Sequence, residues 1–142
     1  MIHEEICTYE VAKLAKEKGF DIHCVPFYAL EDFTAEYIDD IGEFYEVDFE
    51  KGYLYLNYPI KGLLHKEKML PAPTQSLLQR WMREERGYYV YPFFDNDELK
   101  WTFVVREKTG DKWIPLVGET PNFDVFEEAM DAGLKFVLEN FV

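Results

Sequence analysis

Residues 88–106 read YYVYPFFDNDELKWTFVVR, and this stretch decides the fold class. Aromatic and β-branched residues dominate both ends, which is typical of strands, and the polar middle, Asp95–Glu98, is typical of a turn. We therefore predict two strands, over residues 88–94 and 99–106, that pair antiparallel as a hairpin 88–106. A further turn at Gly110 predicts a short third strand at residues 113–114.

A second hairpin is predicted over residues 44–58, where apolar and acidic residues alternate before Gly52 and a tyrosine-rich run follows it. Upstream, residues 22–28 are typical of a strand that Pro26 interrupts or ends, because proline cannot donate to a strand ladder. We expect residues 59–72 to form an irregular connection.

Three helices are predicted, over about residues 9–18, 74–86 and 124–140. The first begins after Thr8, whose side chain can cap it, and ends at Gly19, which can adopt a left-handed conformation. Together with the two hairpins, these helices predict an α+β fold with a mostly antiparallel sheet of about five to six strands.

The helix over residues 74–86 has an apolar face of residues three and four positions apart, Leu77, Leu78, Trp81 and Met82. Trp81 lies centrally in this stripe, so we expect it to be a buried core anchor. We expect the other side, with Gln79, Arg80 and Arg83, to face water or the acidic residues 31–50.

The helix over residues 124–140 opens on Asp124 and Glu127, which have the D-x-x-E spacing of a capping box. Gly133 weakens the middle of this helix by about 1 kcal/mol relative to alanine, which suggests close packing of another backbone. The predicted inner face comprises Phe126, Met130, Leu134, Val137, Leu138 and Phe141.

The composition is that of a folded domain, because 48% of the residues are apolar and 18% are aromatic. The length suits one core, so we expect residues 1–142 to form a single globular domain. No apolar run approaches the roughly 20 residues that cross a bilayer, and no secretory signal pattern begins the chain. Cys7 and Cys24 form no disulfide framework, so we expect a cytoplasmic protein.

The net charge of −13 disfavours direct binding to nucleic acid or to an anionic membrane. Residues 31–50 contain nine acidic residues and no basic one. Two interpretations stay open: this segment is a solvated face, or it mimics a nucleic-acid backbone and inhibits a host defence or DNA-binding protein. Residues 31–42 have helical spacing but crowd like charges, so their structure stays undecided.

The sequence contains no phosphate-binding glycine loop, no dinucleotide fingerprint and no nucleophile elbow. His3, His23 and His65 are scattered, and none has the spacing from a second ligand that a metal site requires. We therefore expect no enzyme activity, no catalytic residue, no metal and no cofactor.

Two predicted strands, residues 53–58 and 88–94, are apolar or aromatic on both faces, whereas a one-sided sheet alternates with charge. Either these are core strands whose tyrosine hydroxyls reach solvent, or a protein partner or a second copy covers one face. The candidate interaction surface comprises Tyr53, Tyr55, Tyr89, Tyr91, Arg80 and Arg83.

One specific stretch, residues 71–84, reads PAPTQSLLQRWMRE and resembles a recurrent segment of small uncharacterised proteins from gut-bacterial prophages and mobile elements. Those proteins also tend to carry helices like residues 11–21 and 126–134, so the resemblance spans most of the chain. It carries over no activity and no catalytic residue, and it implies a small cytoplasmic protein in a phage context.

Three functions are carried forward as hypotheses. The leading one is a non-enzymatic accessory protein that binds a protein partner or forms a homodimer. The alternatives are the acidic mimic described above and a small-molecule site between sheet and helices, which requires a pocket with convergent polar groups.

Overall fold

The computed structural model describes residues 5–22, 24, 27–29, 44–46, 53–55, 69–115 and 121–142. The chain divides into two compact units, which we describe separately. The C-terminal unit comprises Met1–Cys7 with Thr74–Val142, and the N-terminal unit comprises Thr8–Pro73. A single globular domain over residues 1–142 stays a prediction.

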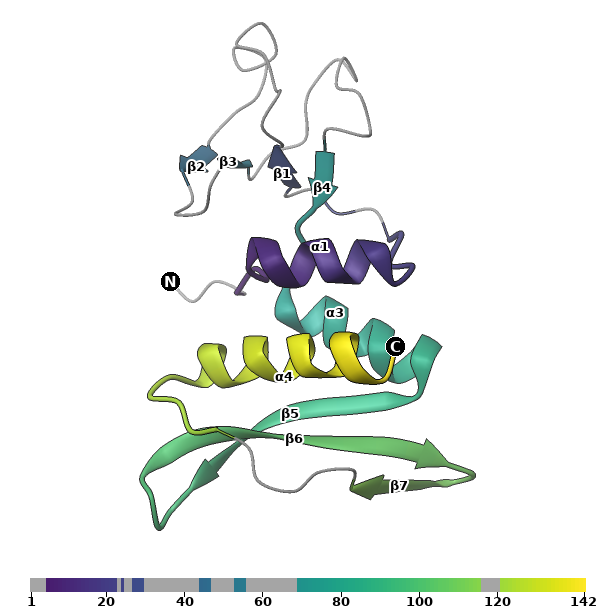
Figure 1. The fold of residues 1–142 in the computed structure, drawn as a ribbon, viewed down its shortest axis with the longest axis vertical. Helices are drawn as coiled ribbons and strands as arrows, with labels where there is room; N and C mark the ends of the chain where they lie inside the picture. Colours follow the sequence, from purple (N-terminus) through teal and green to yellow (C-terminus); the bar gives the residue numbers. More distant parts are fainter. Residues whose placement is uncertain are drawn as a thin grey trace, which may run out of the picture. The chain divides into compact units, whose positions relative to one another are not determined.

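The C-terminal unit contains a sheet of β5 (Tyr88–Asp95), β6 (Lys100–Thr109) and β7 (Lys112–Pro115), in the order β5-β6-β7 (Figure 1). Both pairings are antiparallel, which confirms the predicted hairpin and the short third strand. The Oδ1 atom of Asp95 accepts hydrogen bonds from the backbone amides of Asp97 and Glu98, at 2.9 and 3.3 Å, and so stabilises the turn.

The helices of this unit lie on one side of the sheet: α3 (Gln75–Trp81), its π-helical continuation η2 (Met82–Arg86) and α4 (Phe126–Asn140) (Figure 1). The predicted helix over residues 74–86 is confirmed, although its second half is wider than an α-helix. The side chain of Thr74 caps α3 by accepting a hydrogen bond from the Leu77 amide at 3.2 Å. Gly87, with φ of 79°, ends the segment in the left-handed region.

The capping box predicted for α4 is wrong. The residue before the helix is Val125, and no side chain caps the first turn. Asp124 instead pairs with the ammonium of Lys100. Its position is fixed because the preceding residue, Phe123, exchanges two backbone hydrogen bonds with Trp101, at 2.6 and 2.8 Å. The tertiary pairing with β6 therefore overrides the local capping pattern.

The core of the C-terminal unit lies between the sheet and α4. Val90, Phe103 and Val105 are buried on the sheet side. The buried residues of α4 are Ala129, Met130, Gly133, Leu134, Val137 and Leu138. Two predicted inner residues are corrected, since Phe126 is 42% exposed and Phe141 is half-buried at the end of the helix, where its ring stacks on Tyr88.

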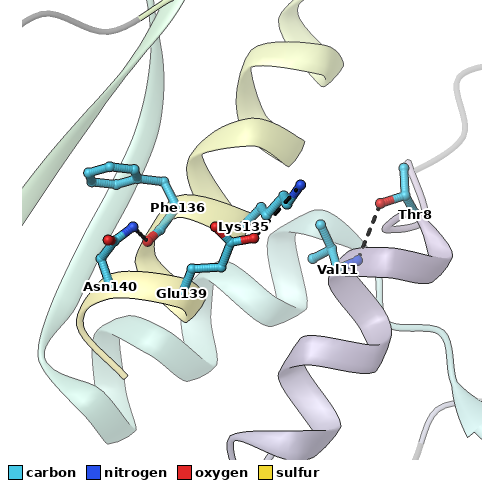
Figure 2. A network of polar contacts seen from close by, with 6 residues as sticks. All are labelled: Thr8, Val11, Lys135, Phe136, Glu139 and Asn140. Carbon is cyan, nitrogen blue, oxygen red and sulfur yellow. Dashed lines mark hydrogen bonds and ion pairs between the residues drawn. The ribbon is translucent and has the colours of Figure 1, made fainter.

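Gly133 confirms the expected close packing, although the neighbours are side chains and not another backbone. A Cβ atom at this position would lie 2.6 Å from the Cγ2 atom of Val90 and 3.0 Å from the Cβ atom of Phe103. On a more exposed part of α4, Lys135 pairs with Glu139 at 3.7 Å, and the Asn140 side chain donates to the Phe136 carbonyl oxygen (Figure 2).

The N-terminal unit contains the helix α1 (Tyr9–Glu17), which confirms the helix predicted over residues 9–18. The Thr8 hydroxyl accepts a hydrogen bond from the Val11 amide at 3.4 Å (Figure 2). Gly19, with φ of 101°, ends the helix, and the following Phe20 donates its amide to the Ala15 carbonyl oxygen. Both ends therefore follow from local sequence.

The described strands of the N-terminal unit are β1 (Phe27–Ala29), β2 (Phe44–Glu46), β3 (Tyr53–Tyr55) and β4 (Met69–Pro71). They form a second antiparallel sheet in the order β2-β3-β1-β4. The pairing of β2 with β3 agrees with the predicted hairpin over residues 44–58, and the undecided residues 31–42 lie outside the described residues. Residues 59–72 were expected to be irregular, but β4 pairs with β1 along three residues.

The α+β class, the three helices and the antiparallel pairing are therefore shown by the described residues, whereas a sheet of about five to six strands is not confirmed. The described strands form two sheets, of four and three strands. Which strands share a sheet depends on contacts between distant residues, such as those of β1 with β4, and a strand pattern in the sequence carries no information on them.

Candidate functional site

The sheet of the C-terminal unit has one face covered by helices. Successive side chains of a strand point to opposite faces, and Val90, Phe103 and Val105 are buried on the side of α4. Their sequence neighbours therefore lie on the other side, where the structure describes no helix of this unit (Figure 1). We call this side the open face; it comprises Tyr89, Tyr91, Phe93, Val104, Arg106, Lys108 and Trp113.

The rings of the open face form a cluster. The ring of Tyr89 lies between two others, with centroids 4.9 Å from Tyr91 and 6.0 Å from Trp113. Phe93 follows Tyr91 on the same face of β5 and is 53% exposed. A contiguous group of aromatic side chains that are half-buried or exposed is a common feature of binding surfaces.

Arginine side chains flank this aromatic cluster. The Nε atom of Arg106 donates a hydrogen bond to the Tyr91 hydroxyl oxygen at 3.0 Å. The guanidinium of Arg83, from η2, lies 5.6 Å from the centroid of the Tyr89 ring, which is a cation–π geometry. Both contacts leave further guanidinium N–H donors for a ligand. Lys108, exposed on the same face of β6, adds a third positive charge.

The structure brings together three of the six residues predicted for the interaction surface: Tyr89, Tyr91 and Arg83. Arg80 does not join them, because its exposed side chain pairs with Glu84 one turn along the helix, at 3.0 Å. Tyr53 and Tyr55 lie on β3 of the N-terminal unit.

Sequence reasoning missed Phe93, Arg106 and Trp113. The feature of the sequence that could have identified Phe93 and Arg106 is the register of the β5–β6 hairpin. In this register Tyr89 pairs with Arg106, and Phe93 pairs with Thr102. Once the turn over residues 96–99 is fixed, counting back along β5 and β6 places Phe93 and Arg106 on one face, and the pairing of Trp113 with Lys108 places Trp113 there as well.

Neither described cysteine has the features of a nucleophile. Burial raises the pKa of the Cys24 thiol to about 11, and this thiol donates to the Ile22 carbonyl oxygen at 3.4 Å. Cys7 is fully buried. In the described ranges, no three His, Cys, Asp or Glu residues cluster as a metal site would require, and His3, His23 and His65 lie outside those ranges.

Comparison with protein-family models, with curated proteins and with solved structures finds no match for this chain. Within the described ranges, no helix has both the length and the apolar character needed to cross a membrane. Function is therefore inferred from the chemistry of the open face and of the neighbouring helices.

Proposed function

We propose that this protein is a non-enzymatic accessory protein that acts by binding another protein through the open face. The observation that carries the proposal is the cluster of Tyr89, Tyr91, Phe93 and Trp113, flanked by arginine side chains. Tyrosine, tryptophan and arginine are the residues that contribute most to the binding free energy of protein interfaces.

The charge of the open face supports a partner that carries carboxylates. Arg83, Arg106 and Lys108 lie on or beside this face, although the chain as a whole has a net charge of −13. A two-fold symmetric homodimer through this face would bring two copies of these cations into one interface. An acidic protein partner would pair with them, so we favour it over self-association.

Two further properties belong to the proposal. The free thiols of Cys7 and Cys24 support a reducing, cytoplasmic location. A prophage or mobile-element origin rests on the resemblance of residues 71–84. The acidic mimic stays a prediction, since residues 31–50 lie mostly outside the described residues.

A cross-linked pull-down with matched variants tests the proposed function. We expect the wild-type protein to retain a specific partner that the Phe93→Ala/Trp113→Ala variant loses. The control is Ile114→Ala, which removes an exposed apolar side chain from the opposite face of β7 and should bind like wild type. Lys108→Glu should weaken binding in a salt-dependent manner.

Three results would contradict the proposal. Equal loss of the partner in the Ile114→Ala variant would show that the open face has no special role. A dimer in light scattering that dissociates on Phe93→Ala/Trp113→Ala would assign this face to self-association. Reproducible turnover by the purified protein in a broad hydrolase screen would exclude a purely accessory role.

A further inference from the structure

A pocket of about 200 Å³ lies within the C-terminal unit, on the helix side of the sheet and apart from the open face. The segment before α1 contributes to its wall because the Glu5 carbonyl oxygen accepts a hydrogen bond from the Gln75 amide at 2.8 Å. The residues that line it include Glu5, Gln75, Gln79, Phe126, Glu127 and Met130.

Two glutamines, one helical turn apart on α3, are among the lining residues of this pocket. Gln75 is 94% buried, as only 6% of it is exposed, and its Nε2 atom donates to the Glu127 carbonyl oxygen at 2.9 Å. Gln79 donates in the same way to the Val90 carbonyl oxygen at 2.6 Å. Among the described residues, neither Oε1 atom has a hydrogen-bond donor, and for the buried Gln75 an acceptor without a donor is costly.

Two carboxylates add negative charge to the same pocket. Glu5 and Glu127 are among its lining residues, and neither forms an ion pair within the part of the chain that the structure describes. No lysine, arginine or histidine is among the lining residues. The polar lining therefore includes amide and carboxylate oxygens beside the Ser76 hydroxyl, and no basic side chain.

The remaining wall is apolar. Met130 is buried at one side, and Phe126 is 42% exposed at the other. The ring of Phe126 is held by an edge-on contact with Trp101, with centroids 5.2 Å apart. The ring of Phe126 therefore packs against Trp101 of β6 and not in the core, and Phe126 is among the residues that line the pocket.

We propose that this pocket binds a small organic cation, a primary ammonium group carried on a short apolar body. An ammonium group has three donors and no acceptor, which matches the unused amide oxygens and a carboxylate. The apolar body would pack against Phe126 and Met130. The volume is below that of sites for drug-sized ligands, so the ligand is a small free amine or the lysine side chain of a partner.

Titration of the full-length protein by NMR tests this assignment. The probe is phenethylamine, and its two controls are phenylacetate, which carries the opposite charge, and the neutral 2-phenylethanol. We expect phenethylamine to shift the side-chain amide signals of Gln75 and Gln79 and to bind at least tenfold more tightly than either control. An N-acetylated, C-amidated lysine distinguishes the second source of the same cation, and saturable binding of either amine supports the proposal.

Matched variants identify the groups responsible. Glu5→Gln and Glu127→Gln should each weaken binding of the preferred amine about tenfold, as expected when one charge-assisted contact is lost. The control is Glu128→Gln, which removes the neighbouring exposed carboxylate of α4 and should leave binding unchanged.

Three results would overturn the assignment: equal binding of phenylacetate, no saturable binding of either amine, or amine binding that survives Glu5→Gln and Glu127→Gln combined. Loss of the amine in the Phe93→Ala/Trp113→Ala variant would also overturn it, because that variant changes the open face alone. The proposed protein-binding function stands or falls independently.

Discussion

The two faces of the β5-β6-β7 sheet are formed by the same strands, yet their side chains differ in kind. The covered face carries Val90, Phe103 and Val105, which are at most 4% exposed and pack against α4. The open face carries tyrosine, tryptophan and arginine, whose polar ends contact one another or remain in solvent. Apolar burial on one face supplies stability, whereas the amphipathic side chains of the other can be exposed at little cost and are suited to binding.

On the helix side of the sheet, the stability of the fold should depend most on Trp81. This residue is 5% exposed, and the sequence predicts that it is buried. Trp81→Ala should lower the free energy of unfolding by about 3–5 kcal/mol, because it leaves a large cavity. Urea denaturation measures this loss. Arg80→Ala is the control on the same helix, and it should cost less than about 1 kcal/mol because its ion pair with Glu84 is exposed.

A different result for Trp81 would change the comparison of the two faces. If Trp81→Ala melts within a few degrees of the wild type while a partner interaction disappears, the tryptophan is part of a binding surface. The covered side would then also bind, and the core assignment of α3 would be wrong.

Two phenylalanines on neighbouring strands compare the faces directly. Phe103 is 4% exposed on the covered face, and Phe93 is 53% exposed on the open face. We expect Phe103→Ala to cost about 3–4 kcal/mol of unfolding free energy and Phe93→Ala about 0.5 kcal/mol or less. Losses of similar size in chemical denaturation would show that both faces contribute to one core.

Gly133 tests how tightly the covered face is packed. Alanine would gain about 1 kcal/mol of helix propensity, but its Cβ atom would lie 2.6 Å from the Cγ2 atom of Val90. Because the clash costs more than the propensity gains, Gly133→Ala should destabilise the protein by a net amount of about 1–2 kcal/mol. Val90→Ala in the same chain should recover part of this loss in a double-mutant cycle, and full additivity would contradict the close contact.

The sequence predicts those parts of the fold that depend on near neighbours. The ends of α1 follow from Thr8 and Gly19, and the β5–β6 hairpin follows from residues within one turn of each other. The pairing of β1 with β4 could not be predicted, because β4 lies about forty residues along the chain and has only three residues in the strand. Nothing in its local pattern identifies that pairing.

The candidate sites were predictable to different extents. The tyrosines of the open face stood out because aromatic residues occupy both faces of their strand. A small-molecule site between sheet and helices was one of the hypotheses, but the residues of this pocket were not predicted, because Gln75 and Gln79, on a helix, look like ordinary surface residues in sequence. Gln75 is buried and Gln79 is half-buried, and their side-chain N–H groups donate to carbonyl oxygens of α4 and β5, which lie far from them in the sequence. Phe126 was misassigned because helical periodicity cannot show that the helix begins at the edge of the sheet.

The smallest expected effect concerns how the two helices of the covered side begin. Thr74 caps α3 through its hydroxyl, so Thr74→Ala should cost about 1 kcal/mol. Asp124 caps nothing and forms an ion pair with Lys100, and its side chain is 75% exposed, so Asp124→Ala should cost no more than about 0.5 kcal/mol. Raising the salt concentration should remove the loss of unfolding free energy caused by Asp124→Ala and leave the loss caused by Thr74→Ala unchanged. Salt screens an exposed ion pair but not a neutral hydrogen bond.

A loss of 1 kcal/mol or more for Asp124→Ala that does not depend on salt would mean that the capping box forms in solution. The start of α4 would then be set by its own sequence and not by the pairing of Phe123 with Trp101.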